Sequence, residues 1–443
     1  MFIEFQVGNF RSFRDVQKFT MQAAPKRAND GGMEEGNVFE VEGFRLLKSK
    51  AIYGSNASGK SNLSKAISAF ALMVSYSVSR EDLPKIIWND RFQLLSEWDT
   101  QPVFFQYSFM VDSRTYRYGF QILAGSVTYE WLFGNGEGES ESLYFMRNPE
   151  GLKIEEKYFP GSGIYMDLAF SGNGELFRSD SLFLTGAALN GNRFAANIRN
   201  FISSMISVDV TNEYPATQSA MNDLEKGTEE ERKALIKLIN AADTGIEDLK
   251  ILKMSETLLE KHFTKDIQQR MNETQKENMQ ALFSFHSKYD ENGNIVEQIP
   301  VPFGKWESQG TSKLFGIGSL ILKSLRTGRT IIIDEFDTSF HPNLTLKFVQ
   351  LYHSKETNPF NAQLIFITHD TALLRRADLR RDQICLVNKD HYGNSSLKTL
   401  IEYKGVRKDA SYEKEYLNGR YDAVPFLNEI DWLLTKTKSN NGL

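Results

Sequence analysis

The stretch Gly54-Ser55-Asn56-Ala57-Ser58-Gly59-Lys60-Ser61 decides the fold of this chain. It fits the pattern G-x-x-x-x-G-K-[ST], in which glycines let backbone N–H groups wrap phosphates and a helix N-terminus adds partial positive charge. An apolar strand over 46–53 precedes it, and an amphipathic helix over about 62–79 follows it. A chance match in a Gly/Ser-rich turn would lack this context. The stretch therefore predicts a phosphate-binding loop in an α/β sheet.

Two residues of this loop have specific expected contacts. Lys60 would place its ammonium group at the β- and γ-phosphates of ATP, and the Ser61 hydroxyl would bind Mg²⁺. Backbone N–H groups from Gly54 to Gly59 would supply further contacts to phosphate oxygens. The loop therefore predicts ATP and Mg²⁺ as cofactors.

A second stretch, Thr330-Ile331-Ile332-Ile333-Asp334-Glu335, places two carboxylates after an apolar run. The β-branched residues predict a buried central strand. Adjacent acids at its end indicate a cation or a water, the alternative being a strand that meets solvent at an acidic turn. Because this pair and the phosphate loop together complete one site, we predict that Asp334 binds Mg²⁺ and that Glu335 is the general base.

A third stretch, from Gln363 to Asp370, predicts another buried strand that ends in Thr368-His369-Asp370. Ligands bind at the carboxyl edge of the parallel strands in open α/β sheets. We therefore expect neutral His369 to form a hydrogen bond with the γ-phosphate. The remaining histidines show no metal-ligand spacing and are expected at the surface or in the core.

The segment Ser308-Gln309-Gly310 comes directly before an amphipathic helix. A hydroxyl together with the free N–H groups of a helix start can bind an anion. On its own the segment would be interpreted as a simple N-cap. Its position shortly before the Asp334 strand favours a nucleotide contact, and both interpretations stay open.

We interpret the chain as one α/β head that is built from both of its ends. Residues 1–178 and 283–443 form this head, and residues 179–282 form a helical insertion that serves as a lid or docking domain. Residues 101–134 alternate apolar and aromatic positions, as antiparallel strands do. The insertion is helix-rich and strongly charged, with a clear helical segment at 256–278.

Composition limits the class of protein. Of 443 residues, 41% are hydrophobic and 25% are charged, as in ordinary globular proteins. The 52 basic and 57 acidic residues give a net charge of -5, which makes no whole-chain electrostatic case for nucleic-acid binding. The single Cys385 excludes a disulfide framework and a Cys-based zinc site. Without a signal peptide or a bilayer-length apolar run, we expect a cytoplasmic protein that does not contact the membrane.

The order of these motifs resembles that of the ABC-type ATPases, and more narrowly their SMC/RecF/OLD branch. Within this branch the chain is most similar to bacterial AbiL/RloA-like ATP-binding proteins, akin to the PARIS and Septu phage-defence ATPases. The resemblance covers nearly the whole chain and is weakest over 130–215. The matching segments are Asn9-Phe10-Arg11-Ser12-Phe13, Gly54 to Asn62, Glu307 to Thr311, Asp334 to Pro342, Asp382-Gln383-Ile384 and Tyr416 to Phe426.

The resemblance implies an ABC/SMC-like P-loop ATPase head, with a mixed sheet, flanking helices, an antiparallel β subdomain and an inserted helical domain. It implies a homodimer or larger homo-oligomer around ATP, in which Ser308, Gln309 and Gly310 of one protomer meet the nucleotide of another. Asn62 then belongs to the phosphate-binding loop. Arg11 would reach the phosphates, with an exposed loop arginine as an equal alternative.

Three departures from the pattern of these relatives stand out. The helix start reads Ser308-Gln309-Gly310 where Ser-Gly-Gly is usual, and Ser339-Phe340-His341 replaces a Leu-Asp that contributes contacts across the dimer. The glutamine loop is not evident. Gln93 and Gln106 are its candidates, and each is also interpretable as an ordinary surface residue.

Two functions compete. The first is a Mg-dependent ATPase of an anti-phage defence system, which senses infection and controls a separate effector, a nuclease or a toxin. The alternative is a RecF/SMC-like DNA-binding repair ATPase. The negative net charge of the chain argues against a protein whose main task is to clamp DNA. Whether nucleic acid is a further partner stays an open question. A local basic cluster could bind DNA or could be a solvated helix end; it comprises Arg375, Arg376, Arg380 and Arg381.

Overall fold

The computed structural model describes residues 1–25, 36–135, 140–163, 165, 178–210, 214–253, 280–338, 340–406 and 411–424. The helix expected at 256–278 lies outside the described residues, as does Ser339 of the departing loop.

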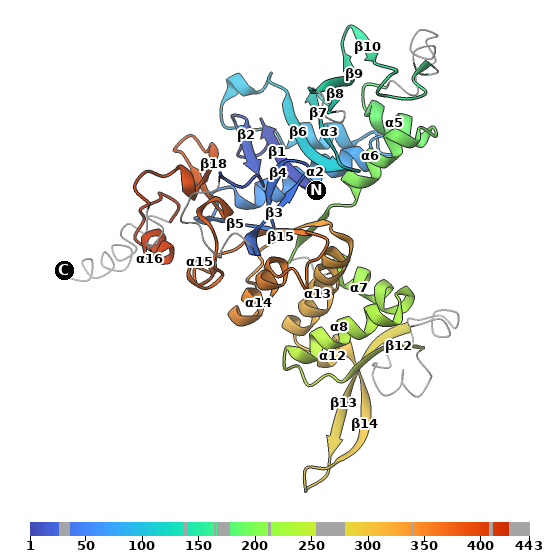
Figure 1. Cartoon of the computed structure of the whole chain (residues 1–443), viewed down its shortest axis with the longest axis vertical. Coiled ribbons are helices and arrows are strands. Elements are labelled where there is room, and N and C mark those ends of the chain that lie inside the picture. Colours follow the sequence, from blue (N-terminus) through green and yellow to red (C-terminus); the bar gives the residue numbers. More distant parts are fainter. Residues whose placement is uncertain are drawn as a thin grey trace, which may run out of the picture.

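A six-stranded mixed sheet holds all three predicted buried strands (Figure 1). Five neighbouring strands run parallel, and the sixth pairs antiparallel at one edge. The three central strands are buried over their whole length, as expected where both faces of a sheet are covered. In spatial order the strands are β11 (Ile206–Asp209), β15 (Thr330–Asp334), β16 (Gln363–Ile367), β5 (Ser49–Gly54), β17 (Ile384–Lys389) and β18 (Ser395–Thr399).

A seven-stranded antiparallel sheet forms the second layer, as the alternation over 101–134 predicts. Its N-terminal strands enter the same sheet, so the chain start is part of this layer. In spatial order the strands are β10 (Gly151–Ile154), β9 (Ser142–Asn148), β8 (Ser126–Gly134), β7 (Arg114–Leu123), β6 (Val103–Val111), β1 (Phe2–Gly8) and β2 (Gln17–Thr20). A separate two-stranded ribbon consists of β3 (Val38–Val41) and β4 (Phe44–Leu47).

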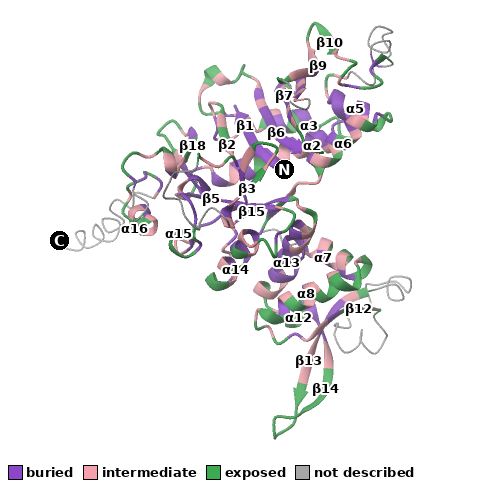
Figure 2. Cartoon of the chain, viewed as in Figure 1, coloured by how far each residue is buried: buried purple, intermediate pink, exposed green. Residues whose placement is uncertain are grey.

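Helix α2 (Lys60–Tyr76) joins the two sheets and begins at the phosphate-binding loop. Its Phe70 ring is fully buried and packs against rings of the antiparallel sheet, stacking on Phe120 with a centroid distance of 5.3 Å. On the mixed sheet, Ile52 and Ile332 belong to the same apolar cluster. Figure 2 shows this buried band between the layers. The helix therefore ties the loop's position to both sheets.

The packing differs from the expected boundary at residue 179. Helices α5 (Phe183–Leu189) and α6 (Arg193–Ser203) bury their apolar stripes in the same cluster as α2. The next segment, β11, pairs in parallel with β15 and is therefore a strand of the head. The sequence did not predict this strand, because it is short and its Ser207 and Asp209 are exposed.

The part of the chain that projects from the head is mixed in structure rather than purely helical (Figure 1). Helices α7 (Tyr214–Lys226) and α8 (Glu229–Ala241) pack on α13 (Gln309–Thr327) through a shared apolar cluster. Beside them lies a three-stranded sheet whose β13–β14 hairpin extends outward. This sheet and the short helix after it comprise β12 (Asp248–Lys253), β13 (Gln280–Tyr289), β14 (Ile295–Pro302) and α12 (Phe303–Trp306).

The remaining described helices are short, except one that covers the mixed sheet beside β16 and β5. That helix is α14 (Pro342–His353). The others are α3 (Leu83–Asn89), η1 (Ser96–Trp98), α15 (Leu373–Arg376), η3 (Arg381–Gln383), η4 (Leu400–Glu402) and α16 (Tyr412–Leu417).

Candidate functional site: a nucleotide-binding edge of the mixed sheet

The three predicted motifs meet at one edge of the mixed sheet. Strand β16 lies between β15 and β5, and all three run parallel. Parallel strands end at the same edge, so the loop after β5, the acids that end β15 and the histidine after β16 are neighbours there. These segments lie far apart in the sequence, and the order of the strands in the sheet brings them together.

The phosphate-binding loop has a backbone that only its residue types allow. Gly59 has φ of 105°, and a Cβ there would lie 2.3 Å from the Ser395 hydroxyl and 2.5 Å from the Ser12 hydroxyl. A Cβ on Gly54 would lie 2.5 Å from the carbonyl oxygen of Val387. Glycine is therefore required at Gly59 by conformation and at Gly54 by space.

Lys60 lies inside this loop. Its Nζ donates to the carbonyl oxygens of Gly54 at 2.9 Å and Ser55 at 2.8 Å. Burial lowers the pKa of Lys60, while the nearby carboxylates of Asp334 and Glu335 oppose this shift. The ammonium group thus lies within the electrostatic reach of the acids that end β15, as a shared phosphate site requires.

Asp334 and Ser61 are in direct contact. The Ser61 hydroxyl donates to Oδ1 of Asp334 at 3.2 Å, and the Ser64 hydroxyl donates to Oδ2 at 3.1 Å. Burial raises the pKa of Asp334, and these two hydrogen bonds act against that rise. One carboxylate therefore bridges the first two turns of α2 to the end of β15.

The donor set fits a hard divalent cation. Ser61 and Asp334 offer a hydroxyl and a carboxylate oxygen, the ligand type that Mg²⁺ takes alongside phosphate oxygens and water. Among the described residues, no group of three or more His, Cys, Asp and Glu side chains could hold a metal by itself. In the phosphate-binding loop, the buried Ser58 hydroxyl has no hydrogen-bond partner among the residues that the structure describes. The residues thus suit a metal that arrives with a nucleotide.

Glu335 adopts a left-handed backbone with φ of 55°, which is uncommon for a residue other than glycine. Its N–H donates to Oδ1 of Asp334 at 3.1 Å, and its Oε2 accepts from the Thr338 hydroxyl at 3.3 Å. Such strain persists where the surroundings fix it and is frequent at functional sites. The side chain is only partly buried and therefore open to a water molecule.

Asp337 links the ends of β15 and β16, and the motif analysis assigned it no role. Its Oδ1 accepts from the Thr368 hydroxyl at 2.7 Å and from the His369 N–H at 3.0 Å. Partial burial and the charge of Lys60 lower the pKa of His369, although three carboxylates oppose the shift. His369 is therefore favoured in its neutral form, and Asp337 fixes its backbone. Its place in the quoted Asp334–Pro342 segment was the only sequence signal.

A further carboxylate at this edge also escaped the sequence analysis. Asp209 ends β11 in register with Asp334 on β15. Its negative charge contributes to the raised pKa of Asp334. A four-residue strand in a helix-rich segment carries too little pattern to be predicted, so the position of Asp209 followed only from the sheet.

Ser308 begins α13 as its N-cap. Its hydroxyl accepts from the Thr311 N–H at 3.1 Å, which establishes the structural interpretation of this segment. Gln309 is exposed and Gly310 is partly buried at the helix start. Just before it, the partly buried Glu307 carboxylate bonds to His286 of β13 at 2.9 Å. The helix start is thus fixed to the β13–β14 hairpin.

The other candidate side chains are engaged elsewhere. Arg11 forms an ion pair with Asp90 at 2.7 Å. Gln93 donates to the carbonyl oxygen of Asn89, and Gln106 lies in β6 of the antiparallel sheet, where it accepts from Arg117. These contacts do not place either glutamine at the nucleotide-binding edge.

The predicted basic cluster is also held by contacts within the chain. Arg380 forms a buried ion pair with Asp382 at 2.7 Å, and Arg375 pairs with Glu413 at 3.4 Å. Arg376 donates to the side chain of Asn343, and Arg381 donates to a backbone carbonyl. Of these arginines, Arg380 is buried, whereas Arg375 and Arg376 are exposed.

Fold and site together define the class of this protein: it is a P-loop ATPase, an ATP-hydrolysing enzyme with a head of the ABC/SMC type. The chain belongs to the family described as "AAA domain, putative AbiEii toxin, Type IV TA system", whose model matches residues 51–161 and 189–375. These ranges include the phosphate-binding loop, Ser308, Asp334 and His369. The expected fold class and ATP hydrolysis are thereby confirmed, whereas the narrower AbiL/RloA resemblance stays a prediction.

Two solved structures are similar over most of the chain. The SMC head domain from Thermotoga maritima has 12% sequence identity and a TM-score of 0.39, over 90% of this chain and 98% of that chain. A structure of the recombination mediator protein RecF-ATP in the RecFOR pathway has 12% identity and a TM-score of 0.31, over 90% and 97%. Among curated proteins, none matches the sequence.

Proposed function

We propose that the chain hydrolyses ATP with Mg²⁺ at this edge and thereby controls a separate effector, a nuclease or toxin, in anti-phage defence. The observation that carries the catalytic part is the convergence of Lys60, Ser61 and Asp334 with Glu335 where β5 and β15 end. The family description mentions a toxin and a type IV TA system, which agrees with a defence role; the separate effector is part of our proposal.

Each side chain has one role in this proposal. Lys60 neutralises phosphate charge, and Ser61 and Asp334 hold Mg²⁺, which when bound would offset charge on the β- and γ-phosphates. Glu335 takes the proton of the attacking water. Neutral His369, fixed through its backbone by Asp337, bonds to the γ-phosphate.

The proposal includes a homodimer or larger homo-oligomer around ATP. Ser308 and Gln309 are exposed and Gly310 is partly buried at a helix start, where N–H groups and partial positive charge favour an anion. We assign this start to the γ-phosphate bound by a second protomer. The arrangement would couple hydrolysis to the separation of two chains.

We place this activity in the cytoplasm, where ATP is available. Among the described residues, no helix is both long and apolar enough to cross a membrane. Within the basic cluster, Arg380 is buried in an ion pair with Asp382, whereas Arg375 and Arg376 are exposed, so nucleic acid stays a further partner to be tested.

The first test is the substitution Glu335→Gln. The amide keeps the shape of the side chain but loses its basicity, so hydrolysis should slow by about 10²-fold or more while ATP still binds. The measurement is phosphate release beside equilibrium binding of ATP. Glu356→Gln, at an exposed position beyond α14, is the matched control and should retain the wild-type rate. A wild-type rate in Glu335→Gln would refute the role of Glu335.

The effector is tested by co-purification from the native host. An associated nuclease or toxin whose activity changes in the Glu335→Gln background supports the defence function. Bound DNA with no associated protein would instead support the repair ATPase.

A further inference from the structure

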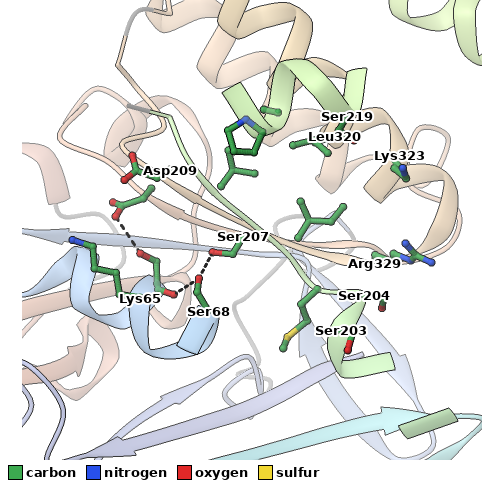
Figure 3. A pocket seen from close by; sticks show the side chains of 17 residues that line it. Lys65, Ser68, Ser203, Ser204, Ser207, Asp209, Ser219, Leu320, Lys323 and Arg329 are labelled. Carbon is green, nitrogen blue, oxygen red and sulfur yellow. Dashed lines mark hydrogen bonds between the residues drawn. The ribbon is translucent and has the colours of Figure 1, made fainter. Parts of the chain in front are cut away.

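A pocket of about 530 Å³ lies against β11, the outermost strand of the mixed sheet (Figure 3). Helix α2 forms one wall, and α7 and α13 form the other. Every residue from Ser203 to Asp209 lines the pocket, and Ser207 and Asp209 of β11 are exposed. Apolar side chains such as Val208 and Leu320 lie among serine hydroxyls. The pocket thus exposes a strand edge between two helical walls.

The backbone geometry shows which groups of β11 face the pocket. The Val210 N–H donates to the carbonyl oxygen of Asp334 on β15. Along a strand the N–H and C=O groups of successive residues point to alternate sides, so Val208 also bonds toward β15. The N–H and C=O of Ser207 then point to the free side. The Ser207 hydroxyl accepts from the Ser68 hydroxyl at 2.8 Å.

One end of the pocket favours a negatively charged side chain, whereas the carboxylates of Asp209 and Asp334 line the pocket elsewhere. Lys323 and Arg329 lie together at the end where Ser203 and Ser204 line the wall (Figure 3). Lys323 pairs with Asp223 at 3.2 Å, whereas Arg329 is exposed and has no ion-pair partner within the described part of the chain. An acidic side chain that enters the pocket from this end would meet the Arg329 guanidinium.

We propose that the free edge of β11 binds an extended, acidic segment of a partner protein by strand addition. Main-chain hydrogen bonds to Ser207 would supply affinity, and Arg329 would select an acidic residue. The inference deepens the proposed function, because this segment would belong to the effector that the ATPase controls. Strand β11 ends beside Asp334, so the segment would lie next to the nucleotide-binding edge.

The walls of the pocket restrict what can occupy it. An open sheet edge invites pairing with another sheet, and proteins commonly cover such an edge or place Lys or Pro on it. The β11 sequence Ile206-Ser207-Val208-Asp209 contains neither residue. Helices form both walls of the pocket, so we take its occupant to be one extended segment rather than the edge of a folded sheet.

The test uses a fluorescein-labelled peptide of alternating valine and glutamate, with fluorescence anisotropy as the readout. Ser207→Pro removes the outward N–H without removing a bond to β15, and should weaken binding at least about tenfold. Ser207→Ala keeps the N–H and should bind the peptide within about twofold of wild type. Comparing the two variants separates the contribution of the backbone N–H from that of the hydroxyl. Arg329→Glu should weaken the acidic peptide and improve binding of a valine–lysine peptide.

Hydrogen exchange provides a measurement that does not depend on the proline variant. Added acidic peptide should slow exchange in the segment 203–210 of the wild-type chain. Equal binding by the wild type and Ser207→Pro, or the absence of peptide binding and of protection, would overturn the inference. These assays need no ATP turnover, so their failure is distinct from a failure of the Glu335→Gln test.

Discussion

At the scale of single residues, Asp337 is an unexpected link between the two catalytic strands. Its one oxygen Oδ1 accepts both the Thr368 hydroxyl and the His369 N–H. Asp337→Ala leaves both donors without this partner and should cost about 1–2 kcal/mol of unfolding free energy. It should also reduce ATP turnover, because the His369 backbone is no longer fixed. Urea unfolding and phosphate release measure the two effects.

Asp337→Asn is the matched control for this prediction. The amide oxygen can still accept both hydrogen bonds, so stability should stay within about 0.5 kcal/mol of wild type. If Asp337→Ala were as stable and as active as Asp337→Asn, the link between the strand ends would have no energetic role.

At the scale of elements, α14 is anchored on the mixed sheet by a titratable side chain. Its last residue, His353, bonds through Nε2 to the Ser49 hydroxyl of β5 at 2.8 Å. Burial lowers the pKa of His353 from 6.5 to about 4, and the charge of Lys48 adds to this shift. The unfolded chain therefore binds a proton at this site more readily than the folded chain does.

The sign of the resulting pH dependence follows from proton linkage. Stability from neutral His353 is fully present above about pH 6.5 and is lost as pH falls toward 4, by about 1–3 kcal/mol. His353→Gln does not titrate there, so its stability relative to wild type should rise over this window. Urea unfolding of both proteins between pH 7.5 and about 4.5 checks this. Parallel stability curves would exclude a buried neutral histidine.

The sequence could predict those elements whose characteristic residues lie close together in the chain. The loop from Gly54 to Ser61 and the strands β15 and β16 were found because glycine spacing, β-branched runs and terminal acids lie within a few consecutive residues. The predicted roles of their site residues stay predictions, although the sheet brings those residues to one edge.

Contacts between distant segments lay beyond sequence reasoning. The Gln363 side chain bonds to both the N–H and the carbonyl oxygen of Phe2, and so connects β16 with the start of β1. The roles of Asp209 and Asp337 likewise depend on sheet register and on hydrogen bonds between strand ends. Such relations appear only when the strand order is known.

At the scale of the whole molecule, the proposed dimer predicts that active sites are shared between chains. Ser308 caps α13 on the projecting part of the chain, whereas Lys60 lies in the head between the two sheets. Ser308→Arg should leave ATP binding intact and abolish hydrolysis, because a bulky cation would replace the hydroxyl at the neighbouring γ-phosphate. Lost capping should cost only about 1 kcal/mol. Thr228→Arg, which removes the N-cap of α8, is the matched control and should hydrolyse ATP normally.

Mixing two inactive variants tests the shared site directly. In a mixed dimer of Ser308→Arg and Lys60→Ala chains, one site combines intact Lys60 with intact Ser308, and the other site is doubly broken. Random mixing of independent sites should therefore restore about a quarter of the wild-type rate. If mixed dimers form, as native mass spectrometry of differently tagged chains can establish, but no activity returns, then Ser308 does not act on the partner's nucleotide. Recovery would instead require the helix start of one chain and the phosphate-binding loop of another to form a single catalytic site.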